Sequence, residues 1–252
     1  FKQTRGHQIS FFVEDTYRAR QNLTLTVGLR WDPFLPYTDK LGQVAGYRPG
    51  AVSQRFKNAP PGAIFAGDAD FPEAGMNNDM NNFSPRFGFA WAPRLSSRPT
   101  SVRGGYGMFF LRPFPRLYNN FVESAPFSPT MVLNSVDIRD PYGSSGVRNP
   151  FPPFAPVDLS PTAPFSTPMP YAYFQTDWSV GYLQSWNLTL EQQFAGDLLI
   201  RAAYVGNKGT HLQSFRERNA AVYGPGATVG NTNARRPLAP YFASVRMMVD
   251  AG

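Results

Sequence analysis

The sequence predicts an all-β protein, and more specifically a section of an antiparallel transmembrane β-barrel with about six strands. Three observations lead to this fold class. Hydrophobic residues recur at every second position in several segments, which is the period of a strand with one apolar face. The connections between these segments alternate between short and very long. Proline (25 residues) and glycine (22 residues) are abundant among the 252 residues, and both disfavour helices.

The composition excludes several other classes of protein. The chain has no cysteine, which rules out a disulfide scaffold and thiol chemistry. Aromatic residues make up 15% of it, which argues against disorder, and no apolar run approaches the roughly 18 residues of a membrane-spanning helix. The net charge of +7 comes from 24 Lys and Arg against 17 Asp and Glu. These basic residues are scattered singly, so we expect no nucleic-acid partner.

The first pair of strands is the clearest. In residues 23–32 the side chains of Leu25, Val27 and Leu29 point one way, while Thr24, Thr26 and Arg30 point the other way. The preceding segment, 8–18, alternates in the same manner except at Phe12 and Asp15. Residues 19–22 join the two segments and have the length of a hairpin connection.

Two further pairs follow. Residues 82–92 and 100–110 alternate and are joined by 93–99, and residues 177–194 and 198–205 alternate and are joined by 195–197. The last of these six segments has the least regular pattern. We therefore predict three hairpins in succession.

Between the hairpins lie two long connections, 33–81 and 111–175. Outer-membrane β-barrels combine short periplasmic turns with long extracellular loops, and their strands alternate between lipid-facing and lumen-facing residues. Large aromatic residues also fall where the two interfacial girdles of such a barrel belong. They are Tyr17 and Trp91 at the end with the short turns, and Trp31, Phe83 and Phe110 at the other end.

A soluble β-sandwich would show the same alternation over a single hairpin. The asymmetry of the connections and the placement of the aromatic residues favour the barrel. On that interpretation the polar face lines the lumen, and its charged candidates are Arg30, Arg86, Arg103, Glu191 and Arg201. The arginines would either attract an anionic substrate or pair with carboxylates of the barrel or of a plug, and we favour pairing.

No residue pattern indicates a catalytic, cofactor-binding or metal site. His7 and His211 are far apart and lack the spacing of metal ligands. Asp68, Asp70 and Glu73 lie in a predicted loop, where a solvated acidic cluster is a better interpretation than a calcium site. We therefore expect neither an enzyme nor a cofactor.

Several segments resemble the barrel of TonB-dependent outer-membrane receptors, specifically the Oar-like group that carries an N-terminal carboxypeptidase-regulatory-like domain. The more specific matches are FFVEDTYRARQNLTLTVGLRWD (11–32) and the YVGNKGTHL part of AAYVGNKGTHL (202–212). Weaker ones are NNFSPRFGFAWAP (81–93), SVRGGYGMFF (101–110) and SWNLTLEQQF (185–194). Together they cover about a quarter of the chain.

The resemblance implies an active transporter in the outer membrane of a Gram-negative bacterium. Its partners would be outer-membrane lipid, its own plug domain in the lumen, the TonB complex acting through an N-terminal region, and an unidentified ligand. Because plugged transporter barrels have about 22 strands, we expect residues 1–252 to be one partial barrel domain, with the plug and N-terminal domains outside it. The alternatives are a passive porin, a barrel adhesin and a secreted soluble β-rich binding protein.

Overall fold

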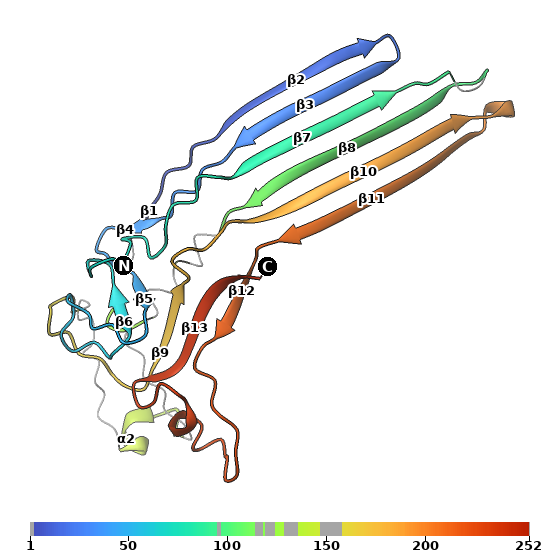
Figure 1. Cartoon of the computed structure of the whole chain (residues 1–252). Helices are drawn as coiled ribbons and strands as arrows, with labels where there is room; N and C mark the ends of the chain where they lie inside the picture. The colour runs from blue at the N-terminus through green and yellow to red at the C-terminus, as the bar shows by residue number, and fades with distance from the viewer. Residues whose placement is uncertain are drawn as a thin grey trace.

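The computed structural model describes residues 3–94, 97–113, 118, 124–128, 136–146 and 158–251. Its main element is an antiparallel sheet of six strands in the order β11-β10-β8-β7-β3-β2 (Figure 1). The strands are β2 (Phe11–Arg20), β3 (Leu23–Trp31), β7 (Phe83–Trp91), β8 (Thr100–Leu111), β10 (Gly181–Gln193) and β11 (Leu199–Thr210). The predicted fold class is thus confirmed, and within the described chain the sheet is open, with β2 and β11 at its edges.

Strand pairing brings the alternating hydrophobic residues onto one continuous face. Residues that pair directly across antiparallel strands point to the same side. Val27 pairs with Asp15 on one side and Phe87 on the other, and Phe87 pairs with Tyr106, which pairs with Trp186. We call this side the apolar face and the opposite side the polar face. Members of the apolar face include Phe11, Val13, Tyr17, Leu25, Val27, Leu29, Trp31, Phe83, Phe87, Phe89, Trp91, Val102, Tyr106, Met108, Phe110, Trp186, Leu188, Leu190, Ile200 and Tyr204.

The strand ends differ in places from the sequence prediction. β10 begins at Gly181, so Trp178 and Val180 lie before the strand, where both are buried, and not on an exposed alternating face. β11 continues to Thr210, past the predicted end at residue 205. The short links lie at one end of the sheet, and η2 (Ala195–Asp197) forms part of the third (Figure 1). Residues 95 and 96 of the second link lie outside the described residues.

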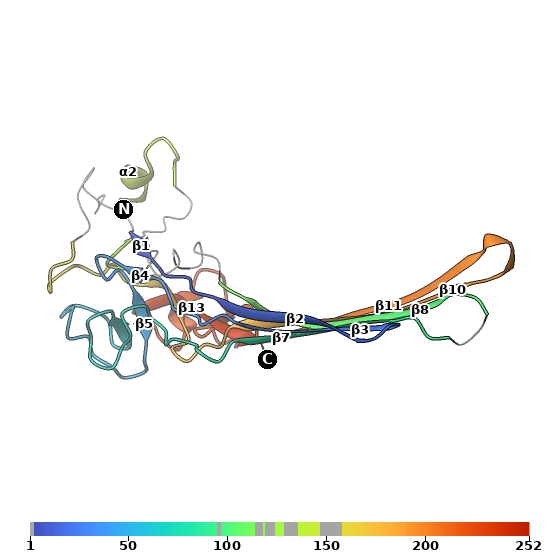
Figure 2. The ribbon, with the colours of Figure 1, turned by 90° about the horizontal axis from the view of Figure 1, so that it is seen from above.

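The long connections pack together at the opposite end of the sheet (Figures 1 and 2). We call this part the loop body; it comprises the described residues of 3–10, 32–82, 112–180 and 211–251. Residues 33–81 and 111–175, predicted only as loops, contain short strands of their own. Of the second connection, residues 114–117, 119–123, 129–135 and 147–157 lie outside the described residues.

Short elements organise the loop body. β1 (Thr4–Arg5) pairs with β4 (Thr38–Asp39), and β5 (Ala45–Tyr47) pairs with β6 (Ala63–Phe65). A three-stranded sheet has the order β12-β13-β9, in which β13 is antiparallel to β12 and parallel to β9. Its strands are β9 (Met169–Phe174), β12 (Leu212–Glu217) and β13 (Phe242–Ala251). The helical turns are α2 (Pro141–Ser145) and η3 (Asn233–Arg235).

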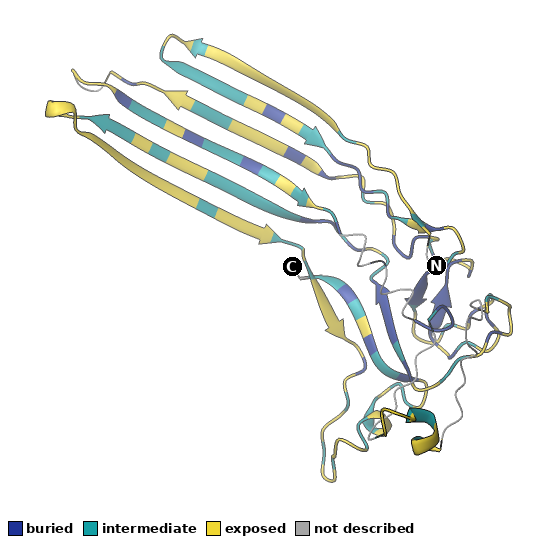
Figure 3. Cartoon of the chain, turned by 180° about the vertical axis from the view of Figure 1, so that it is seen from behind, coloured by how far each residue is buried: buried dark blue, intermediate teal, exposed yellow. Residues whose placement is uncertain are grey.

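The hydrophobic core of the chain lies in the loop body and not in the large sheet (Figure 3). Phe65 and Val245 are fully buried there, and Phe65 packs against Phe56 with 4.9 Å between ring centroids. Asp68, expected to be solvated, is buried as well. Its carboxylate accepts hydrogen bonds from the Ser53 hydroxyl and from backbone N–H groups, including that of Phe65, so it organises this region.

Candidate functional site

All five polar residues singled out from the sequence lie on the polar face of the sheet. Arg86 pairs with Gly28, Arg30 with Ser84, Arg103 with Thr189, and Glu191 with Arg201. Glycine recurs on this face at residues 28, 88, 105 and 107, and such small residues leave space for the long arginine side chains. That this face lines a lumen stays a prediction.

Near the short-turn end, one carboxylate lies between two arginines. The Glu191 oxygens are 3.6 Å from Arg201 Nε and 3.8 Å from Arg103 Nη2. Arg103 Nε also donates to the Ser101 hydroxyl at 3.1 Å. Both guanidinium-bearing side chains are more than 60% exposed, so water screens these ion pairs. The pairing that the sequence favoured for Arg103 and Arg201 is therefore present.

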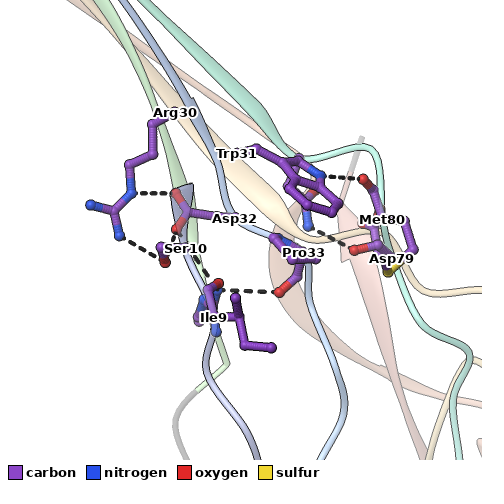
Figure 4. Close-up of polar contacts among 10 residues, drawn as sticks. Ile9, Ser10, Arg30, Trp31, Asp32, Pro33, Asp79 and Met80 are labelled. Atoms are coloured by element: carbon purple, nitrogen blue, oxygen red, sulfur yellow. Dashed lines mark hydrogen bonds and ion pairs between the residues drawn. The ribbon is translucent and has the colours of Figure 1, made fainter. Parts of the chain in front are cut away.

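At the other end of the polar face, Arg30 belongs to a tighter cluster (Figure 4). Its Nε donates to Asp32 at 2.7 Å, its Nη2 donates to the Ser10 hydroxyl at 3.0 Å, and that hydroxyl donates to Asp32 at 2.6 Å. Arg112 Nη2 lies 3.8 Å from the same carboxylate and donates to the Pro33 carbonyl. This cluster ties the ends of β2, β3 and β8 to one another.

Asp32 is the first residue beyond β3 and is the centre of that cluster. Partial burial alone would raise the pKa of this carboxyl, but the hydrogen bonds from Arg30 and Ser10 and the charge of Arg112 outweigh it and hold the pKa below its usual value. Sequence reasoning did not single out Asp32, Ser10 or Arg112. The signal for Asp32 was nevertheless present, because Arg30 and Asp32 are two residues apart in the predicted strand 23–32 and so fall on the same side of it.

Arg86 differs from the other three arginines. It has no ion pair with any described residue; its guanidinium lies over the Phe109 ring, 5.2 Å from the centroid. Arg86 lines a hollow of about 340 Å³ on the polar face, together with Glu14, Gly28 and Arg30. The hollow therefore offers both signs of charge to a bound group.

The described residues contain no group of His, Cys, Asp and Glu side chains arranged to hold a metal ion. A search of the same residues finds no helix with the length and hydrophobicity needed to cross a membrane.

An open antiparallel sheet with one apolar face, one charged face and all its long connections at one end is a section of a membrane β-barrel wall. The chain belongs to a family of outer-membrane β-barrel domains, since a family model described as "Outer membrane beta barrel domain" matches residues 1–252. Comparisons with curated proteins and with solved structures found no match.

Proposed function

We propose that this chain is part of the barrel of a TonB-dependent active transporter of the Oar-like group. It forms part of the wall and of the ligand-capturing surface of an outer-membrane protein in a Gram-negative bacterium. A plug domain encoded in the same protein fills the lumen, the TonB complex displaces it, and an unidentified ligand passes. The process requires neither covalent chemistry nor a cofactor, and nucleic acid is not a partner.

The observation that carries the proposal is the combination of a nearly flat sheet with an arginine-rich polar face. Seen edge-on, the six strands overlap in a thin layer, except where β10 and β11 bend away from it at the end with the short links (Figure 2). Since barrel diameter grows with the number of strands, a weakly curved wall belongs to a wide barrel, a class that includes both the plugged transporters of about 22 strands and the open porins of about 16–18. Arginine outnumbers carboxylate among the five polar-face residues, which suits an acidic plug surface or an anionic ligand.

Conductance distinguishes an active transporter from a passive porin. The full-length protein, inserted into a planar lipid bilayer, should hold its channel closed, whereas a variant without the plug domain should conduct ions. The periplasmic domain of TonB should also bind the full-length protein in detergent. Steady conductance by the intact protein, with no TonB binding, would favour the porin and end the proposal.

The proposal also fixes the orientation of the barrel. The loop body lies outside the cell, and the short links lie in the periplasm. An epitope inserted beside Ser144 in α2 should be accessible to antibody on whole cells, and one inserted at Gly196 in η2 should not. Labelling at Gly196 alone would mean that the orientation is inverted.

A further inference from the structure

A hollow of about 530 Å³ lies where the loop body meets the apolar face of the sheet. It is lined by residues 77–81, Phe83 and residues 177–179, which come from the segments leading into β7 and β10. The polar groups of its lining side chains are amides, carboxylates, a hydroxyl and the Trp178 indole N–H, and no lysine or arginine lines it. The hollow therefore offers many hydrogen-bonding groups but no cation for a phosphate or carboxylate ligand.

The two lining segments are held together by bonds that do not occupy the hollow's amides. The Asp79 carboxylate accepts from the Val180 N–H at 3.0 Å, and the Asn77 N–H donates to the Thr176 carbonyl at 2.8 Å. The exposed side-chain amides of Asn78 and Asn81 make no hydrogen bond to any described residue. The backbone of the hollow is thus fixed, while these amides remain available.

A buried polar atom at this hollow also lacks a partner. Trp178 lines the hollow and is only 2% exposed, yet its indole N–H has no hydrogen-bond acceptor among the described residues. Buried donors in proteins are almost always paired. This nitrogen has less than 1 Å² of accessible surface, and its ring packs against Phe34 and Phe174, so a hydroxyl oxygen in the hollow would reach it only if the ring moved.

A stacked row of aromatic rings runs from the hollow across the ends of β7, β3 and β2 on the apolar face. Phe11, Trp31 and Phe83 stack in order, with centroid distances of 5.9 and 6.1 Å. Trp31 Nε1 donates to the Met80 carbonyl at 2.7 Å, which fixes the row to the lining of the hollow (Figure 4). Phe83 belongs to both the row and the hollow. The apolar face is therefore continuous with a hollow whose hydrogen-bond donors carry no charge.

We propose that this hollow binds the neutral saccharide headgroup of a membrane glycolipid. Asn78 and Asn81 would bond its hydroxyl groups as donors and acceptors, Asp177 would accept from hydroxyls, and Phe83 would lie against the apolar side of a sugar ring. The acyl chains would lie along the strands of the apolar face, with the aromatic row at their headgroup end. The inference rests on the membrane-barrel assignment and not on the proposed transport.

The test uses the full-length protein in phosphatidylcholine nanodiscs with digalactosyl diacylglycerol as the probe. Native mass spectrometry should show retained glycolipid, and the double variant Asn78→Ala/Asn81→Ala should bind it about tenfold more weakly, the effect of losing two ordinary hydrogen bonds. The matched control is Asn187→Ala, which removes an exposed amide from the polar face and should leave binding unchanged.

A second measurement follows the unsubstituted protein and needs a variant only to assign one signal. The indole N–H signal of Trp178, assigned by its loss in Trp178→Phe, should shift when the glycolipid is added and should not shift with phosphatidylglycerol. Equal retention of glycolipid by the double variant and the control would overturn the proposal. If free digalactose bound equally well, the ligand would be a soluble saccharide and not a lipid. If phosphatidylglycerol displaced the glycolipid, the hollow would not be selective for a neutral saccharide headgroup.

Discussion

The large sheet and the loop body are stabilised in different ways. In the sheet, Val27 on the apolar face is 58% exposed and Phe12 on the opposite face is 77% exposed, whereas Phe65 and Val245 in the loop body are completely buried. Burial of apolar surface is the main favourable term in folding. The loop body buries apolar surface among its own residues, but the apolar surface of the sheet must be buried against lipid and the remainder of the barrel.

The difference implies that a substitution in one region should leave the other largely intact. The two regions are joined mainly at the strand ends, through the cluster around Asp32 and through the segments before β7 and β10. Substitutions in each region therefore show whether the two regions are as independent, and as differently solvated, as the burial pattern indicates.

The largest loss of stability is expected from a substitution in the core of the loop body. Phe65→Ala removes a ring that packs against Phe56, Phe127 and Phe165, and such a change costs about 3–5 kcal/mol. Limited proteolysis of the full-length protein in detergent should show cleavage within the loop body while heat-modifiable gel mobility, which reports the barrel, stays normal. The control is Val52→Ala, at an exposed position of the same region. Loss of the folded barrel in Phe65→Ala would show that the two regions fold as one unit.

The next effect distinguishes the two faces of the sheet. Val27→Arg places a guanidinium on the apolar face, at a cost of roughly 2–4 kcal/mol if that face meets the bilayer midplane. Thr26→Arg places the same group on the polar face, beside Thr16, where water receives it. Folding yield in liposomes, read by heat-modifiable mobility, should fall sharply only for Val27→Arg.

The two variants also test the assignment of the faces, since they differ by one position and introduce the same side chain. Equal losses would mean that both faces are packed against protein. A larger loss for Thr26→Arg would mean that the polar face is the one that meets lipid.

The same contrast explains what the sequence could predict. The six strands of the sheet follow from a local signal, because alternation with period two is visible within about ten residues. The positions of Arg30, Arg86 and Arg103 on the polar face follow from the same alternation. Their partners do not, since the contact of Arg103 and Arg201 with Glu191 depends on the register across three strands.

The loop body was missed because its contacts join distant parts of the chain. The Tyr171 hydroxyl donates to the Gly46 carbonyl, 125 residues away, and the Lys57 N–H donates to the Pro161 carbonyl. The elements that carry these contacts are as short as three residues, as in β5 and β6, and are too short for periodicity to show. Trp178 was misplaced for a related reason, since its alternation with Val180 continued the pattern of β10 although the strand begins at Gly181.

A smaller effect is expected at the junction of the two regions, where Asp32 titrates. Because the pKa of Asp32 is lower in the folded protein than in the unfolded chain, its contribution to stability is complete above the unfolded pKa of about 3.9. It is lost as the pH falls through the folded value. Asp32→Asn should therefore weaken the dependence of unfolding on pH below about 4, measured as the urea midpoint in detergent. The control is Glu73→Gln, at an exposed position. An unchanged dependence of unfolding on acid pH in Asp32→Asn would show that the cluster around Asp32 does not link the two regions.

The smallest effect is expected on the polar face, at Glu191. Glu191→Gln keeps the size of the side chain but removes the charge between Arg103 and Arg201. The arginine side chains are 62% and 65% exposed, and that of Glu191 is 21% exposed. Exposed ion pairs contribute at most about 1 kcal/mol, because water replaces the lost partner. The urea midpoint of the full-length protein should therefore shift little, and the remaining difference should shrink as salt is added. A loss of several kcal/mol that does not respond to salt is what removing one partner of a buried pair produces. That result would mean that plug residues cover this part of the wall and that Glu191 lies at a dry contact, whereas a small, salt-sensitive loss means that water reaches this end of the polar face.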